Sequence, residues 1–187
     1  MSIKVITSPA TEPITLTEAK VHLRVDGTDE DALITSLIVA ARQGAEHLTG
    51  RALMTQTLEF ALDGFADKIK LPRPPFVSVT SFTYVDMAGD TQTLFTDGYV
   101  IDSHSEPARI VRPYGVCWPS TRCQPGAVLI RYQAGYTDAD AVPDQIKSWM
   151  LLRIGMFYAN RESVVTGTSV ENIPHVDRLL DAYRTYI

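Results

Sequence analysis

The sequence predicts an α+β protein: a small helical bundle formed by the N- and C-terminal segments, with an antiparallel β subdomain inserted between them. Two patterns predict this class. Apolar residues recur at helical spacing up to about residue 50 and again after residue 142, while apolar and polar residues alternate in between. We therefore place the helical body at residues 1–52 and 138–187, and the inserted β subdomain at residues 53–137.

Composition excludes several classes of protein. The 187 residues suit one domain with a small subdomain, and 22 acidic against 17 basic residues give a net charge of −5. This charge disfavours a protein that coats nucleic acid by neutralising phosphates. The longest aliphatic run, Leu37–Ala41, is far shorter than a membrane span, and the first residues lack the pattern of a secretory signal. We therefore expect a cytoplasmic product without a membrane segment.

The first fifty residues predict two helices. Thr15-Leu16-Thr17-Glu18 is a capping box, which predicts a helix that starts there and stops near Asp26-Gly27. A second helix is expected from Thr28, where a hydroxyl cap and three carboxylates suit the positive helix end, to Gly50. Its apolar stripe comprises Leu33, Ile34, Leu37, Ile38, Ala41, Ala45 and Leu48.

The middle of the chain predicts short antiparallel strands. Residues 54–62 alternate between apolar and polar, as in a strand with one buried face. A hairpin turn is expected at Asp86–Asp90, and a proline-bearing loop at residues 112–126. The remaining predicted strands cover residues 68–71, 76–86, 91–95, 99–102, 108–111 and 127–134.

Helical pattern returns after Val142-Pro143, with proline at the first turn. Its expected buried stripe comprises Ile146, Trp149, Met150, Ile154, Phe157 and Tyr158. A polar loop is predicted at residues 161–173, followed by a short terminal helix from Pro174. We therefore expect both termini of the chain to be helical.

The residues that usually carry chemistry form no recognised signature. None of the four histidines has metal-ligand spacing, and no motif for acyl transfer, dinucleotides or nucleoside triphosphates occurs. Asp138 and Asp140 could hold a divalent cation, but helix capping explains them better. A Cys117–Cys123 bridge is conceivable, although two buried or half-buried free thiols are expected in a reducing cytoplasm. We expect no enzyme, cofactor or metal.

Two segments are candidates for subunit or partner contacts. In the first, Trp118 either caps the core of the sheet or, with Arg122, contacts a neighbouring subunit; the core role is the more economical. In the second, the loop 161–173 is either a mobile connection or an arm that bridges subunits. As an arm it would bury the aliphatic side chains of Val164, Val165, Val170 and Ile173.

The order of these elements resembles the head–tail connector (adaptor) family of tailed bacteriophages, in the form with a β insertion. The resemblance spans nearly the whole chain. It rests on four segments: Pro13–Val25, Asp29–Arg51, Trp118–Tyr136 and Val142–Glu162. No single segment is a catalytic signature, but their order and spacing together are fairly specific.

The resemblance implies a structural role. Such proteins assemble as rings of about a dozen copies beneath the portal, extend the DNA channel and offer a platform to a tail-completion or stopper protein. DNA would then be transient cargo, and the protein would reside in the neck of a phage, prophage or gene-transfer particle assembled in the bacterial cytoplasm. The alternatives are a monomeric protein- or glycan-binding module and a small enzyme with an unrecognised carboxylate site.

Overall fold

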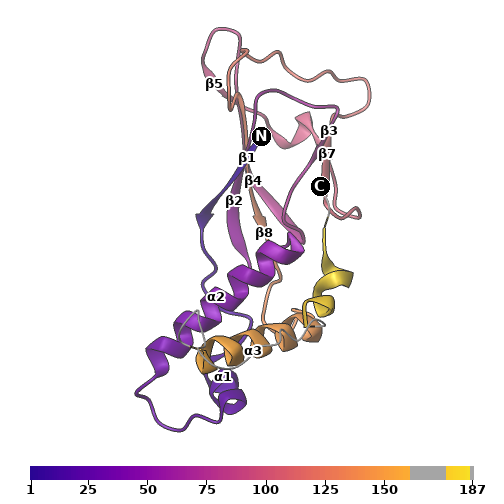
Figure 1. Ribbon diagram of the computed structural model, residues 1–187. Coiled ribbons are helices and arrows are strands. Elements are labelled where there is room, and N and C mark those ends of the chain that lie inside the picture. The colour runs from indigo at the N-terminus through magenta and orange to yellow at the C-terminus, as the bar shows by residue number, and fades with distance from the viewer. Residues whose placement is uncertain (161–175, 186–187) are drawn as a thin grey trace. The chain divides into compact units, whose positions relative to one another are not determined.

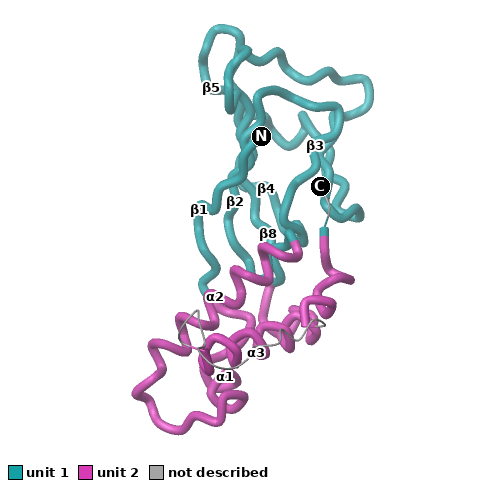
Figure 2. Tube along the Cα trace, viewed as in Figure 1, with its two compact units in different colours: residues 1–10, 50–136, 185–187 teal, residues 11–49, 137–184 magenta. Residues whose placement is uncertain are grey.

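The computed structural model describes residues 1–160 and 176–185 and confirms the α+β class (Figure 1). The chain forms two compact units (Figure 2). The β unit comprises residues 1–10, 50–136 and 185–187, and the helical unit comprises residues 11–49 and 137–184. That the β unit serves as an insertion into a functional helical body stays a prediction.

The β unit contains a five-stranded sheet in the order β1-β2-β8-β4-β5, in which all neighbouring strands are antiparallel. Its central pair, β2 and β8, is in register from Gln56 opposite Ala134 to Leu62 opposite Val128. Alternate residues of both strands are buried, as the period of two predicts. The strands are β1 (Ser2–Thr7), β2 (Gln56–Leu62), β4 (Phe76–Val85), β5 (Thr91–Thr93) and β8 (Val128–Ala134).

A second, three-stranded sheet completes the β unit, in the order β3-β7-β6. It consists of β3 (Lys68–Lys70), β7 (Arg109–Val111) and β6 (Val100–Asp102), and the short 3-10 helix η1 (Thr96–Gly98) precedes β6. Ile69 and Ile110 from this sheet share one apolar core with Leu58, Phe82 and Tyr132 from the larger sheet. One core therefore joins both sheets.

The helical unit packs α2 (Asp31–Thr49) against α3 (Asp144–Ala159), and α1 (Leu16–Leu23) contacts both. The 3-10 helix η2 (Val176–Tyr183) packs on α3 and α2. The predicted capping box is confirmed, because the Glu18 amide donates to the Thr15 hydroxyl and the Thr15 amide donates to the Glu18 carboxylate. The helical unit is therefore held together by contacts between its helices, and its first helix has a capped N-terminus.

Helix ends differ from expectation in two places. The first helix ends at Arg24, which adopts a left-handed conformation (φ 57°), rather than at Asp26-Gly27. The second begins at Asp31 instead of Thr28, and Gly50 ends it with φ 69°, as predicted. The terminal segment is a 3-10 helix.

The prediction that both termini are helical is wrong at the N-terminus, where β1 forms the edge of the larger sheet. Five of its six residues are exposed, so no apolar alternation marks it in the sequence. Cys117 and Cys123 are free, but the expectation that they are buried or half-buried is wrong, because both lie exposed in a surface loop. Among the described residues, no helix is long and apolar enough to cross a membrane.

Candidate functional site

The first two predicted contact residues, Trp118 and Arg122, lie on residues 112–126, a surface loop of the β unit that Trp118 holds in place. The Trp118 indole stacks on Phe65, with ring centroids 4.9 Å apart and planes 7° apart. Its N–H donates to the Ala66 carbonyl oxygen at 3.0 Å. The ring is half-buried and packs against the apolar core, so it fixes the loop to its own β unit.

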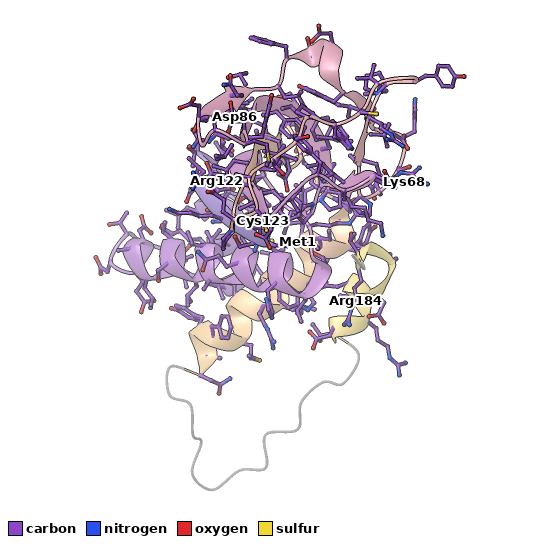
Figure 3. The ribbon with its side chains drawn as sticks, turned by 90° about the horizontal axis from the view of Figure 1, so that it is seen from above. Met1, Lys68, Asp86, Arg122, Cys123 and Arg184 are labelled. Atoms are coloured by element: carbon purple, nitrogen blue, oxygen red, sulfur yellow. The ribbon has the colours of Figure 1, made fainter. Side chains whose placement is uncertain are left out.

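Backbone hydrogen bonds fix the second half of the same loop. The Arg122 amide donates to the Val85 carbonyl at 3.1 Å, and the Gly126 amide donates to the Asp63 carboxylate at 3.0 Å. The Arg122 side chain is exposed and lies against the glycine of the β4–β5 turn, Gly89. Figure 3 shows Asp86, at the start of this turn, on the same side of the β unit as Arg122.

The β4–β5 turn beside Arg122 is itself rigid. The Asp86 carboxylate accepts hydrogen bonds from the amides of Ala88, Gly89 and Asp90, and from the Gln92 side chain at 2.8 Å. The Gln92 hydrogen bond, with the backbone donors, lowers the pKa of Asp86 below its usual value. Arg122 is therefore displayed beside an ordered, negatively charged turn.

The tip of the loop displays an aromatic side chain that the sequence analysis missed. Residues 113–116 form a turn closed by a hydrogen bond from the Val116 amide to the Pro113 carbonyl at 3.2 Å, with Gly115 at φ 75°. Tyr114 is 105% exposed and Val116 is 47% exposed. Proline followed two residues later by glycine is the signal that could have identified this turn.

The other predicted contact residues, Val164, Val165, Val170 and Ile173, lie outside the described residues. The structure thus brings Trp118 and Arg122 onto one fixed loop and leaves the role of the segment 161–173 a prediction.

Several acidic residues of the helical unit have partners within the unit. The Asp138 carboxylate accepts from the Ala141 amide at 2.8 Å and so closes a turn before α3. The expectation that Asp138 and Asp140 cap that helix is wrong, because α3 begins at Asp144 with Pro143 as its N-cap and no side-chain cap hydrogen bond. Asp31 forms an ion pair with Lys20 at 2.6 Å, and the Glu30 carboxylate accepts from the Tyr158 hydroxyl. Within residues 1–160 and 176–185, no group of three histidine, cysteine or acidic side chains could hold a metal ion.

The helical unit carries a shallow apolar groove of about 430 Å³ between α1 and α3. Ile14, Val21 and Leu151 supply its apolar surface, and Glu18 and Lys147 supply charge. A backbone hydrogen bond from Thr15 lowers the pKa of Glu18. Glu18 is engaged in the capping box, so its carboxylate is used structurally.

Charge is distributed unevenly between the two units. The β unit contains nine basic and eight acidic residues, whereas the helical unit contains eight basic and fourteen acidic residues. The acid surplus of the chain therefore belongs to the helical unit.

Comparison with solved structures shows that this fold is shared with chains of gene transfer agent particles. A chain from the neck of an empty gene transfer agent particle, computed with C6 symmetry, matches with a TM-score of 0.82 at 23% identity. A chain from the native neck, computed with C12 symmetry, matches with a TM-score of 0.80 at 24% identity. A chain from the virion of the native gene transfer agent particle matches with a TM-score of 0.81 at 23% identity. Each match covers 100% of this chain and 97% of the other.

The sequence match is more specific about the family. Residues 13–81 carry the sequence pattern of the phage gp6-like head-tail connector protein. This match confirms the resemblance to head–tail connectors that the sequence analysis identified. No curated protein matches the chain.

Proposed function

We propose that this protein is a structural subunit of a head–tail connector, which assembles as a homo-oligomeric ring in the neck of a phage-like particle. The observation that carries the proposal is the connector pattern over residues 13–81, within a fold that corresponds along the whole chain to neck proteins of gene transfer agent particles. A ring requires a head-to-tail contact whose rotation closes. The capped helices of the helical unit supply a rigid body for it.

In this role the ring lies beneath the portal, extends the DNA channel and offers a platform to a tail-completion or stopper protein. DNA is transient cargo, and the work of the protein is structural rather than catalytic. Many copies that each carry surplus acid give a channel wall that repels phosphate, so DNA slides without binding. A strongly basic lumen in the assembled ring would contradict this part of the proposal.

We further propose that the loop 112–126 and the segment 161–173 make subunit or partner contacts. In the first, the anchored Trp118 holds the loop and Arg122 lies exposed on it. In the second, Val164, Val165, Val170 and Ile173 supply aliphatic surface. A fixed loop suits this role, because a preorganised contact loses less conformational entropy on binding.

Co-assembly with the portal protein of the same particle tests the proposed function. Purified chain is mixed with portal, and the complex is analysed by native mass spectrometry and cryo-electron microscopy. We expect a ring of this chain bound to one face of the portal. A chain that stays monomeric with the portal present contradicts the proposal, and favours a monomeric binding module instead. Portal is essential, because connector subunits can remain monomeric until a portal templates them.

A further inference from the structure

Most arginines of the β unit form ion pairs with carboxylates of the same unit. Four arginines are ion-paired within the unit. The pairs are Arg51 with Glu106, Arg109 with Asp102, Arg112 with Asp67 and Arg131 with Glu59. Most of the positive charge carried by arginine in this unit is therefore compensated locally.

Three other basic residues, Lys68, Lys70 and Arg73, lie within one short stretch, which we call the basic strip. None of the three has an ion-pair partner within residues 1–160 and 176–185. Uncompensated charges of one sign this close in sequence repel one another and attract an acidic partner.

The strand β3 determines how the two lysines are displayed. It is an edge strand of the smaller sheet, paired only with β7. Ile69 is buried in the core, so Lys68 and Lys70 on either side of it share the opposite, exposed face. Figure 3 shows Lys68 at the edge of the β unit, on the side away from Asp86 and Arg122.

The backbone holds Arg73 in an unusual conformation. It has a left-handed φ of 59° although it is not glycine and precedes a proline, where extended backbone is favoured. The three prolines around it are fixed by hydrogen bonds. The Pro72, Pro74 and Pro75 carbonyls accept from the Tyr132 hydroxyl, the Ala52 amide and the Gly135 amide. The hydrogen bonds of the neighbouring prolines thus hold the Arg73 backbone in this conformation. The Arg73 guanidinium forms no ion pair with a described carboxylate of the β unit.

A simpler role for the lysines is protection of an edge strand against pairing with other strands. This role accounts for Lys68 and Lys70, which lie on β3. It does not account for Arg73, which lies beyond the strand and whose left-handed backbone is costly. Residues kept in such conformations cluster at functional sites such as ligand clamps and switch regions. Lys68 and Lys70 are exposed and Arg73 is half-buried, so the two lysines supply the surface for recognition and Arg73 adds charge next to it in the sequence.

The distribution of charge indicates what this surface recognises. A head-to-tail ring contact joins two different surfaces of the same chain, one on each copy. This chain carries its acid surplus in the helical unit, with fourteen acidic against eight basic residues. We infer that the basic strip of one copy binds the acidic helical unit of the neighbouring copy in the ring, an inference that rests on the proposed function.

Duplex DNA is a less suitable partner for the strip. DNA-binding domains are usually strongly basic, because each phosphate contact releases counterions and many contacts are needed. The β unit is almost neutral, with nine basic and eight acidic residues. A nearly neutral unit attracts a phosphate backbone weakly, whereas a local strip suffices for an acidic protein surface.

Charge reversal in the assembled ring tests this inference. Rings on the portal are compared for the wild-type chain, Lys68→Glu/Lys70→Glu, Arg73→Gly and the control Lys4→Gln. Lys4 is also an exposed basic residue of the β unit without an ion pair in the described part of the chain. We expect the double reversal to lower the fraction of chain in rings about tenfold, with a clear reduction for Arg73→Gly and none for Lys4→Gln.

Arg73→Gly separates recognition from folding. Glycine adopts the left-handed conformation without a Cβ penalty, so the monomer should melt at the wild-type temperature or above it. Carbodiimide cross-linking of rings made from mixed light and heavy isotope copies then identifies the partner. We expect intermolecular cross-links from Lys68 or Lys70 to carboxylates in residues 11–49 or 137–184.

Each other outcome overturns the inference in an identifiable way. Rings that form normally from the double-reversal variant contradict it while leaving the proposed function intact, and so do lysine cross-links confined to β-unit carboxylates. Reversal that leaves ring formation unchanged but abolishes duplex DNA binding assigns the strip to DNA. A wild-type chain that forms no ring with the portal contradicts the proposed function, and this inference with it.

Discussion

Trp118 stacks face to face on Phe65, 4.9 Å between ring centroids, although the two residues are far apart in the sequence. The Phe65 ring also packs against Phe82 and Tyr84 of β4, with ring centroids 5.8 and 5.6 Å apart. The surface loop 112–126 is therefore joined through one indole to the aromatic part of the core. The position of its exposed tip depends on that contact.

Replacing Trp118 by alanine removes the stack and the hydrogen bond to Ala66. We expect the free energy of unfolding to fall by about 2 kcal/mol, measured by urea denaturation. Limited proteolysis should also cut within residues 112–126 much faster. Tyr114→Ala is the matched control and should change stability by less than about 0.5 kcal/mol. Equal losses for the two variants would show that the stack does not hold the loop.

Gly135 provides a test of the close approach between the ends of β8 and β2. It has φ 122°, and a Cβ atom there would lie 2.1 Å from the Met54 carbonyl oxygen, which is backbone and cannot rotate away. We expect Gly135→Ala to lower the free energy of unfolding by about 3 kcal/mol or more, measured by thermal and urea denaturation.

Gly126→Ala is the control for Gly135. Gly126 is also left-handed, at φ 67°, but apart from its two chain neighbours no described atom lies within 4 Å of the place that a Cβ atom would occupy. Its substitution should therefore cost only the conformational penalty of about 1–2 kcal/mol. If both variants lose the same stability, the cost is conformational, and the steric argument at Gly135 is wrong.

Local patterns predicted much of the fold. The capping box at Thr15, the stop at Gly50 and the hairpin at Asp86–Asp90 each depend on residues close in sequence, and the structure contains all three. The strand β1 could not be predicted in this way. Its pairing with β2 depends on backbone hydrogen bonds to a distant segment, and only Ile3 is even half-buried.

The candidate contact surfaces were predicted less completely. Trp118 and Arg122 stood out by residue type, but the stack on Phe65 required the tertiary structure. The lysines and arginine of the basic strip are visible in the sequence. Their lack of carboxylate partners is not, because ion pairs such as Arg131 with Glu59 join separate strands.

Asp102 should make the stability of the β unit sensitive to acid. Hydrogen bonds from Ser105 and then Arg109 lower the pKa of Asp102 from 3.8 to about 2. Because the folded pKa is lowered, this carboxylate stabilises the fold above about pH 4, and the contribution is lost as pH falls towards 2. Urea midpoints of wild type and Asp102→Asn should therefore differ near neutral pH and converge in acid.

Asp97→Asn is the control for that pH series. Asp97 is an acidic residue of the same unit whose carboxylate makes no hydrogen bond within the described part of the chain. Its substitution should leave the wild-type pH dependence in place. If Asp102→Asn also keeps the wild-type dependence of stability on pH, the hydrogen bonds from Ser105 and Arg109 do not favour the folded state.

Arg42 and Glu46 form an ion pair inside the helical unit, at 3.0 Å, with side chains only 6% and 5% exposed. Arg42 also binds Glu12 at 2.7 Å. The apolar stripe predicted for this helix did not include them, because charged residues are usually assigned to the solvent side. Ile38, Ala41 and Ala45 are buried beside them, so the guanidinium lies on the packed face of α2.

Arg42→Met should lower the free energy of unfolding by about 3–5 kcal/mol, because it removes one member of a buried, hydrogen-bonded ion pair. The double variant Arg42→Met/Glu46→Leu removes both charges and should be more stable than Arg42→Met alone. Urea denaturation of both single variants and the double variant gives the coupling energy. Glu12→Gln changes the more exposed end of the network and should cost less than Arg42→Met. Additive losses from the two single variants would mean that the buried pair is not coupled, and that Arg42 contributes to stability through its packing on α2.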